Sequence, residues 1–222
     1  NAYAKPTNYY AINSVYYPCA LAEKIQGKNL NGTNADIEVV INKNINWHLD
    51  PETTPNEGTY DLTTTLIHEF AHGLGLIGNI TSDCLGNSNF ATPAICDMFV
   101  CDSVVQPIVH KDVNSYSIKS ELLTSQRLYW GGKIAKAYCG EYLKLYAPAN
   151  FNSGSTAYHV DEATYEQGSG YELMSPILQS SEIIHTPDIV TIAMLADLGW
   201  TDYFISIDAV KNSTDVHANM PI

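Results

Sequence analysis

The chain has 222 residues, of which 45% are hydrophobic and 16% charged, and its formal net charge at pH 7 is −13. This composition is typical of a folded globular protein and excludes a disordered one. The negative charge argues against nucleic acid as a partner, because phosphates would be repelled. No apolar run approaches the roughly 20 residues that a membrane-spanning helix needs. We therefore expect one folded, monomeric domain without a membrane span.

The five cysteines favour a secreted, extracellular or cell-surface protein. They are dispersed, and three of them lie in the polar segment 84–101, which in secreted proteins is often tied by disulfides. The odd count leaves at least one thiol unpaired. The first residues, Asn1-Ala2-Tyr3, lack the basic start and the apolar stretch of a signal peptide, so we expect a trimmed segment of a longer precursor.

The first predicted elements along the chain are a helix and a strand. Residues 18–26 place apolar side chains on one helical face, and Gly27 is expected to end that helix. Residues 36–42 alternate between an apolar face and a more polar one. This alternation predicts a half-buried strand.

The next predicted helix has a readable start and end. Asp61 is a good N-cap, and glycines at positions 73, 75 and 78 crowd the other end, where the chain must turn. The broad apolar face that we expect on this helix consists of Leu62, Leu66, Ile67, Phe70, Ala71 and Leu74.

The remainder of the chain is richer in loops. The pattern predicts a helix at residues 120–129 and a strand at residues 142–146. A last helix is predicted to end at Gly199, and a further strand at residues 204–207. The N-cap and first turn of that last helix are expected at Thr186, Pro187 and Asp188.

The helix that follows Asp61 carries the sequence His68-Glu69-Phe70-Ala71-His72. Because His68 and His72 are four residues apart, both imidazoles point to one side of the helix, where they can bind one Zn²⁺ ion at about 2.1 Å. Glu69 lies about 100° round the helix, where its carboxylate can take a proton from water and later pass it to a leaving amine. A buried helix that carries these residues by chance is the alternative, but the cap, the preceding strand and the glycines favour a zinc site.

A zinc site needs a third protein ligand. In the metzincin branch of zinc peptidases, the motif continues to a glycine and then to a third histidine or an aspartate. Gly75 matches that glycine, but the ligand position is Gly78, which has no side chain. The compact motif therefore fails, and the third ligand must come from further along the chain.

The chain resembles the leishmanolysin family of metzincins and related secreted bacterial proteins, in which a long insertion separates the glycine from the third histidine. Here His159 is followed by Tyr171-Glu172-Leu173-Met174-Ser175-Pro176, which is similar to the Met-turn of that family. Residues 188–200 are similar to its closing helix. The likeness covers roughly residues 17–200, with low identity outside the motifs.

This resemblance implies that zinc is bound by His68, His72 and His159, with Glu69 as the base. Other third ligands stay open, and they are Asp161, Glu162, His185 and, if the chain belongs to the zinc peptidases with a glutamate ligand, Glu121.

Other residues near the site also take roles from the resemblance. Met174 would form a hydrophobic floor under the ligands, and Tyr158 or Tyr171 could donate a hydrogen bond to the oxyanion. The strand at 36–42 would form the upper rim of the cleft and pair with an extended substrate, although it could equally be a central strand without that role.

The resemblance implies an α/β (α+β) fold in two subdomains. Residues 1–78 would hold a mixed twisted sheet and the active-site helix, and residues 79–202 the third ligand and the Met-turn. Residues 203–222 would form a strand and tail or begin a further domain. The implied function is that of a zinc-dependent endopeptidase acting on peptide or protein substrates. A binding or adhesion module with a structural zinc ion, and a zinc exopeptidase, are the alternatives.

Overall fold

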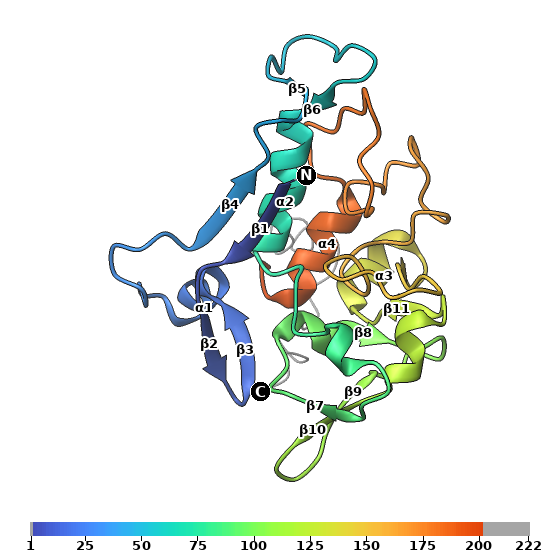
Figure 1. Ribbon diagram of the computed structural model, residues 1–222. Helices are drawn as coiled ribbons and strands as arrows, with labels where there is room; N and C mark the ends of the chain where they lie inside the picture. Colours follow the sequence, from blue (N-terminus) through green and yellow to red (C-terminus); the bar gives the residue numbers. More distant parts are fainter. Residues whose placement is uncertain (1, 202–222) are drawn as a thin grey trace.

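The computed structural model describes residues 2–201, which form an α+β fold (Figure 1). The α-helices of this part are α1 (Cys19–Gln26), α2 (Leu62–Gly73), α3 (Lys133–Cys139) and α4 (Ile189–Leu198). The strands are β1 (Ala2–Pro6), β2 (Tyr9–Ile12), β3 (Val15–Pro18), β4 (Ile37–Ile41), β5 (Trp47–His48), β6 (Tyr60–Asp61), β7 (Asn89–Phe90), β8 (Val100–Cys101), β9 (Val109–Lys111), β10 (Tyr116–Ile118), β11 (Leu128–Trp130) and β12 (Lys144–Leu145). Short 3-10 helices lie at Ser82–Cys84, Ile95–Phe99 and Ser120–Thr124. The strand and tail expected after residue 202 lie outside the described residues.

The strands pair in small groups. Strands β1 and β4, β2 and β3, and β5 and β6 form two-stranded sheets, whereas β7–β10–β9 and β12–β11–β8 are three-stranded. Among these strand pairs of residues 2–201, β5 and β6 run parallel and the others are antiparallel. In residues 2–78, three two-stranded sheets therefore take the place of the single mixed sheet that was predicted for the N-terminal subdomain. Many of the strands have only two or three residues, which leaves little backbone for a larger sheet.

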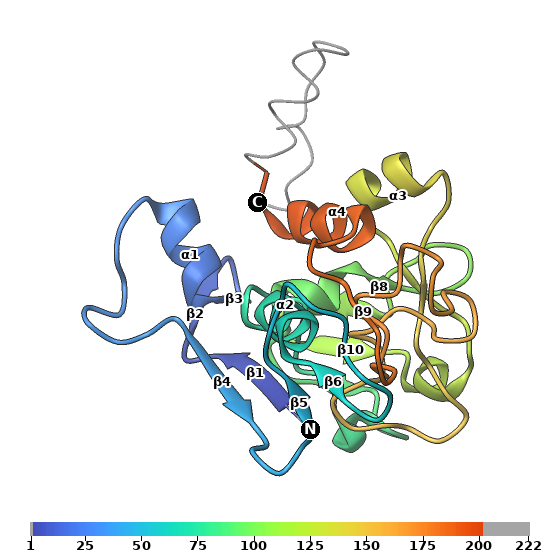
Figure 2. The same ribbon diagram turned by 90° about the horizontal axis from the view of Figure 1, so that it is seen from above.

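Helix α2 lies in the middle of the molecule. Figures 1 and 2 show α1, β2, β3 and β4 on one side of it, and most of the chain after residue 79 on the other. Gly73 allows β4 to approach, because a Cβ atom there would overlap the side chain of Ile37. Gly75 has φ +129°, and a Cβ atom on it would lie 3.1 Å from Pro18 and 3.2 Å from Leu198. Glycine at the end of α2 thus permits both the turn and the close packing.

The predicted start of α2 is confirmed, and its predicted apolar face is only partly right. The carboxylate of Asp61 accepts a hydrogen bond from the Thr64 amide at 2.6 Å, which caps the helix. Phe70, placed on the apolar face, is 46% exposed, whereas Glu69 and His72 are buried. The buried side of α2 is therefore partly polar, as it must be if this side carries a chemical site.

Helices α1 and α4 agree closely with their predictions. Helix α1 ends at Gly27 in the left-handed conformation, as expected. Helix α4 ends at Gly199 but is capped by Asp188, two residues later than the predicted Thr186. The reason is tertiary: the Asp188 carboxylate accepts hydrogen bonds from both Thr191 in the helix and Leu173 in a distant turn.

The helix predicted at 120–129 is wrong. The chain forms a short 3-10 helix there, reverses at Gln126 with φ +58°, and continues as strand β11. Strand β11 pairs with β8 and β12, and these pairings override the local helical pattern. The strand predicted at 142–146 is confirmed in its centre, as β12.

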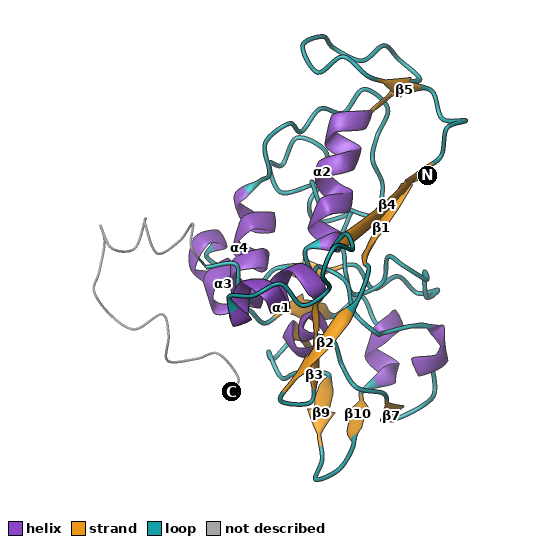
Figure 3. Cartoon of the chain, turned by 90° about the vertical axis from the view of Figure 1, so that its left-hand side faces the viewer, coloured by secondary structure: helices purple, strands orange, loops and turns teal. Residues whose placement is uncertain are grey.

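One hydrophobic core extends through both predicted subdomains, from Tyr17 to Leu198. Helices α3 and α4 lie side by side in this core (Figure 3). The Asp197 carboxylate of α4 binds the Trp130 indole at 2.9 Å and the first amides of α3, which ties the two helices together. Within residues 2–201, the helices fall short of the length and apolar character that a membrane crossing demands.

Candidate metal centre

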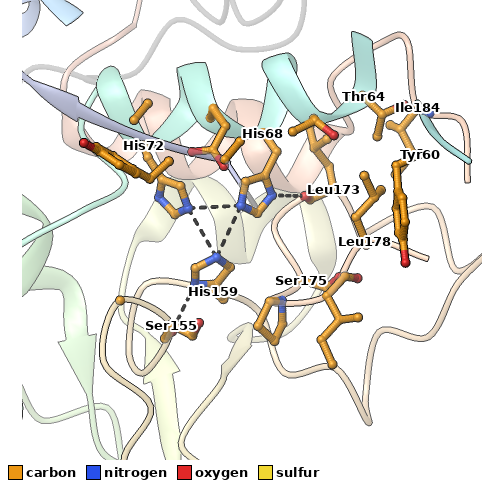
Figure 4. Close-up of a pocket in the computed structure, with 18 of the residues that line it drawn as sticks. Tyr60, Thr64, His68, His72, Ser155, His159, Leu173, Ser175, Leu178 and Ile184 are labelled. Carbon is orange, nitrogen blue, oxygen red and sulfur yellow. Dashed lines mark hydrogen bonds between the residues drawn. The ribbon is translucent and has the colours of Figure 1, made fainter. Parts of the chain in front are cut away.

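Three histidine side chains converge below helix α2 (Figure 4). The Nε2 atom of His72 lies 3.1 Å from that of His68 and 3.2 Å from that of His159, and the third distance, between His159 and His68, is 3.3 Å. His68 and His72 lie one turn apart on α2. His159 comes from a segment joined to β12 by a bridge between Val160 and Leu145. The fold therefore brings together the three histidines that the sequence analysis singled out.

The second nitrogen of each ring is held by a backbone carbonyl. The Nδ1 atoms of His68 and His72 lie 2.7 Å from the carbonyl oxygens of Leu173 and Leu76, and that of His159 lies 3.0 Å from Ser155 O. A carbonyl oxygen can only accept, so each Nδ1 atom carries the hydrogen. In a neutral imidazole, Nε2 then presents a lone pair, the arrangement that metal-binding histidines require.

Burial keeps these imidazoles uncharged at neutral pH. Desolvation lowers the pKa of all three histidines, to about 3 for His72 and well below the usual value for His159. The neighbouring histidines lower the pKa of His72 and His159 further. Three lone pairs thus face one another with no proton between them, which is unfavourable unless a cation lies among them. Nitrogens bound to a tetrahedral ion at about 2.1 Å lie about 3.4 Å apart, close to the distances seen here, so the donor set fits such an ion.

The alternative third ligands lie elsewhere. Among residues 2–201, the group of potential ligands around α2 contains only the three histidines. Asp161 pairs with Lys144 at 3.0 Å, and His185 binds Asp61 at 2.9 Å. Glu162 and Glu121 do not belong to the group either.

The compact motif cannot carry a ligand at position 78 in this fold. A Cβ atom on Gly78 would overlap the carboxylate of Asp97 and lie 2.7 Å from the Tyr158 hydroxyl. Asp97 is fully buried and accepts hydrogen bonds from Tyr158 at 2.5 Å and from the amides of Asn79 and Ala94. It thereby links the exit of α2 to the residue before His159. Asp97 carries no sequence motif, and the sequence analysis missed it.

Tyr158 is therefore not available as an oxyanion donor. Its hydroxyl donates to Asp97 and accepts from the Ile80 amide at 2.5 Å, and the residue does not line the cavity described below. Tyr171 also lies outside the residues that line the cavity. Its ring packs edge-on against Tyr165, with 6.2 Å between the ring centroids. Both predictions of an oxyanion donor are thus unsupported.

The buried Asp97 carboxylate should make stability depend on pH. Burial raises its pKa from 3.8 to about 6, against the hydrogen bonds that lower it. The folded state therefore holds the proton more tightly than the unfolded state, and the stabilisation present below pH 4 is lost as the pH rises to about 6. Asp97→Asn removes this titration. Between pH 4 and pH 7, we expect the free energy of unfolding of the parent to fall by roughly 2–3 kcal/mol relative to that of the variant. This follows from about 1.4 kcal/mol per pKa unit.

Urea unfolding of both metal-free proteins at the two pH values measures this difference. The exposed Asp83→Asn is the matched control for loss of one carboxylate. An equal difference between parent and Asp97→Asn at both pH values would contradict the prediction.

The segment that contains Met174 holds two of the three histidines in place. The Leu173 carbonyl accepts the hydrogen bond from His68, and the Met174 carbonyl accepts one from the Val160 amide at 2.9 Å, next to His159. The side chain of Met174 is fully buried in the core. The turn thus acts through its backbone as a support for the histidines, a role that residue spacing does not reveal.

Glu69 and the histidines open into one cavity of about 690 Å³. Glu69 is 6% exposed, and burial raises the pKa of its carboxyl group, while a hydrogen bond from the backbone of Ala4 acts in the opposite direction. Residues 2–5 of β1 line this cavity, whereas no residue of 36–42 does. The rim that was predicted at 36–42 is therefore formed by β1, which pairs with β4.

A second group of potential ligands comprises Cys19, Glu23 and Asp36. Glu23 accepts the Leu30 amide at 2.6 Å, and Asp36 accepts the Asn31 side-chain amide at 2.7 Å. These carboxylates hold the loop after α1, which explains them without a metal.

All five cysteines are free thiols, so the disulfides expected in segment 84–101 are not formed.

The chain was compared with known proteins. No protein-family model, curated protein or solved structure matches it. The argument for function therefore rests on the site itself.

Proposed function

We propose that the chain is a zinc-dependent endopeptidase of the metzincin type, similar to the leishmanolysin family. The observation that carries this proposal is the convergence of three uncharged imidazoles beside a buried carboxylate in one cavity. Such a set of three histidines with a free fourth position is typical of catalytic zinc sites. A purely structural zinc site would have no use for Glu69 in the same cavity, so the geometry favours an enzyme over a binding module.

The residues of the chain divide the chemistry between them. Zinc, when bound by His68, His72 and His159, would supply Lewis acidity toward water and the scissile carbonyl. Glu69 would hold the proton taken from the attacking water and deliver it to the leaving amine. Burial favours this role, because a carboxyl group with a raised pKa takes up a proton more readily.

The cavity suits an extended peptide. Strand β1 pairs with β4 along one edge only, and within residues 2–201 no strand pairs with its other edge. Residues of β1 line the cavity, and although the Ala4 amide already donates to Glu69, the other backbone groups of this edge could pair with an extended substrate. An extracellular location and a monomeric state belong to the same proposal.

Cleavage of an unfolded protein tests the proposal. The zinc-loaded chain is expected to cleave casein, to stop when a chelator removes the metal, and to recover when zinc is restored. Peptides blocked at both ends distinguish an endopeptidase from an exopeptidase, because only the former cleaves them. No cleavage by a chain that binds one zinc ion would contradict the proposal and favour the binding module.

A further inference from the structure

The cavity continues from the metal centre toward the start of α2. Figure 4 shows Tyr60, Thr64, Leu178 and Ile184 together beyond His68, away from the other two histidines. The Thr64 hydroxyl accepts a hydrogen bond from the Ile184 amide at 2.7 Å, which fixes the segment 177–184 against the helix. This end of the cavity thus has largely apolar walls and a fixed shape.

Besides Glu69, a second carboxylate at the cavity has a free oxygen. Glu182 lines the cavity and is only 5% exposed. Its Oε2 atom accepts a hydrogen bond from the Gln179 amide at 2.7 Å, and no residue between 2 and 201 hydrogen-bonds to Oε1. Glu172 also lines the cavity, but both of its oxygens are engaged by its own loop, by the amides of Gly168 and Tyr171 and the hydroxyl of Ser169.

The surroundings of Glu182 are negative. Burial raises the pKa of Glu182, and the charges of Glu172 and Glu162 raise it further. Lys5 is the only lysine or arginine that lines the cavity in the described part of the chain, and it pairs with Glu38 at 3.3 Å. A positive group placed beside Glu182 would offset the cost of its burial, because charges interact strongly where water is excluded.

We propose that Glu182 makes this end of the cavity a binding site for a positively charged group of the peptide substrate, a lysine or arginine side chain or a free α-amino group. The inference rests on the proposed peptidase activity. The apolar walls would hold the aliphatic stem of lysine or arginine while Glu182 binds its head. The negative potential of the three glutamates would also favour the approach of a basic segment.

Peptides that differ at one position test this proposal. The parent and Glu182→Gln are assayed on blocked peptides carrying lysine, arginine, leucine, glutamine or glutamate at each position beside the bond cleaved. We expect the parent to favour lysine or arginine over leucine by about ten-fold or more in kcat/KM, and Glu182→Gln to lose that preference. The glutamine variant keeps an oxygen for the Gln179 amide, so the loop should persist. The exposed Glu166→Gln is the matched control.

Binding gives a second readout that does not need turnover. The same peptides are titrated calorimetrically into Glu69→Ala and into the double variant Glu69→Ala/Glu182→Gln, and peptides with a free amino terminus separate the two sources of positive charge. Tighter binding of basic or free-amine peptides that is lost in the double variant supports the proposal. A preference for leucine, glutamine or glutamate in the parent, or a basic preference unchanged by Glu182→Gln, overturns it. If nothing is cleaved, the peptidase proposal fails, while the binding data still decide the role of Glu182.

Discussion

Glu69→Ala is expected to abolish nearly all peptidase activity while the fold and the bound zinc persist. The carboxylate lies in the same cavity as the three histidines without belonging to their ligand group. Loss of a general base typically costs about 10²–10⁴-fold in rate. The measurement is kcat/KM on a casein-derived peptide, with zinc content determined on the same sample.

Glu69→Gln provides a second variant of nearly the same shape, which separates loss of the base from loss of packing. It should be as inactive as Glu69→Ala, because an amide cannot take up the proton. Full activity in either variant would mean that Glu69 is not the base, and the mechanism proposed here would have to be abandoned.

His159→Ala is expected to weaken zinc binding by more than about 100-fold, since even the loss of a residue that only supports a ligand costs 10–100-fold. The remaining pair, His68 and His72, would leave an ion with only two protein ligands. Competition with a chromophoric chelator measures the affinity of the parent and of the variant. The peptidase activity of His159→Ala should fall together with its zinc affinity, and added zinc should restore little of that activity.

His110→Ala is the matched control, because His110 is half-buried on β9 and outside the ligand group. Its affinity for zinc should equal that of the parent. If His159→Ala also retained the parent's affinity, the third ligand would have to be another residue. The hydrogen bonds that Ser155 and Met174 make around His159 would then have no role in zinc binding.

The predictions of helix ends are correct where the interactions that set them lie within one short segment. Asp61 caps α2 and Gly27 ends α1 because each acts on backbone groups within a few residues of itself. Residues 120–129 were misread because their local pattern suits a helix, whereas the pairing of β11 with β8 and β12 decides the outcome. The start of α4 moved for a similar reason, since Asp188 also binds the amide of Leu173.

The candidate site also combines features that are local in the sequence with features that depend on tertiary contacts. The spacing of His68, Glu69 and His72 on one helix is a local property, so sequence alone determined which side chains share a face. His159 was selected by resemblance, and only the tertiary structure places its Nε2 atom 3.2 Å from that of His72. The roles of Asp97 and Glu182 could not be predicted from the sequence, because the burial of a carboxylate depends on contacts with segments that are distant along the chain. Hydrogen-bond partners, burial and cavity shape depend on such contacts, and these belong to the folded chain.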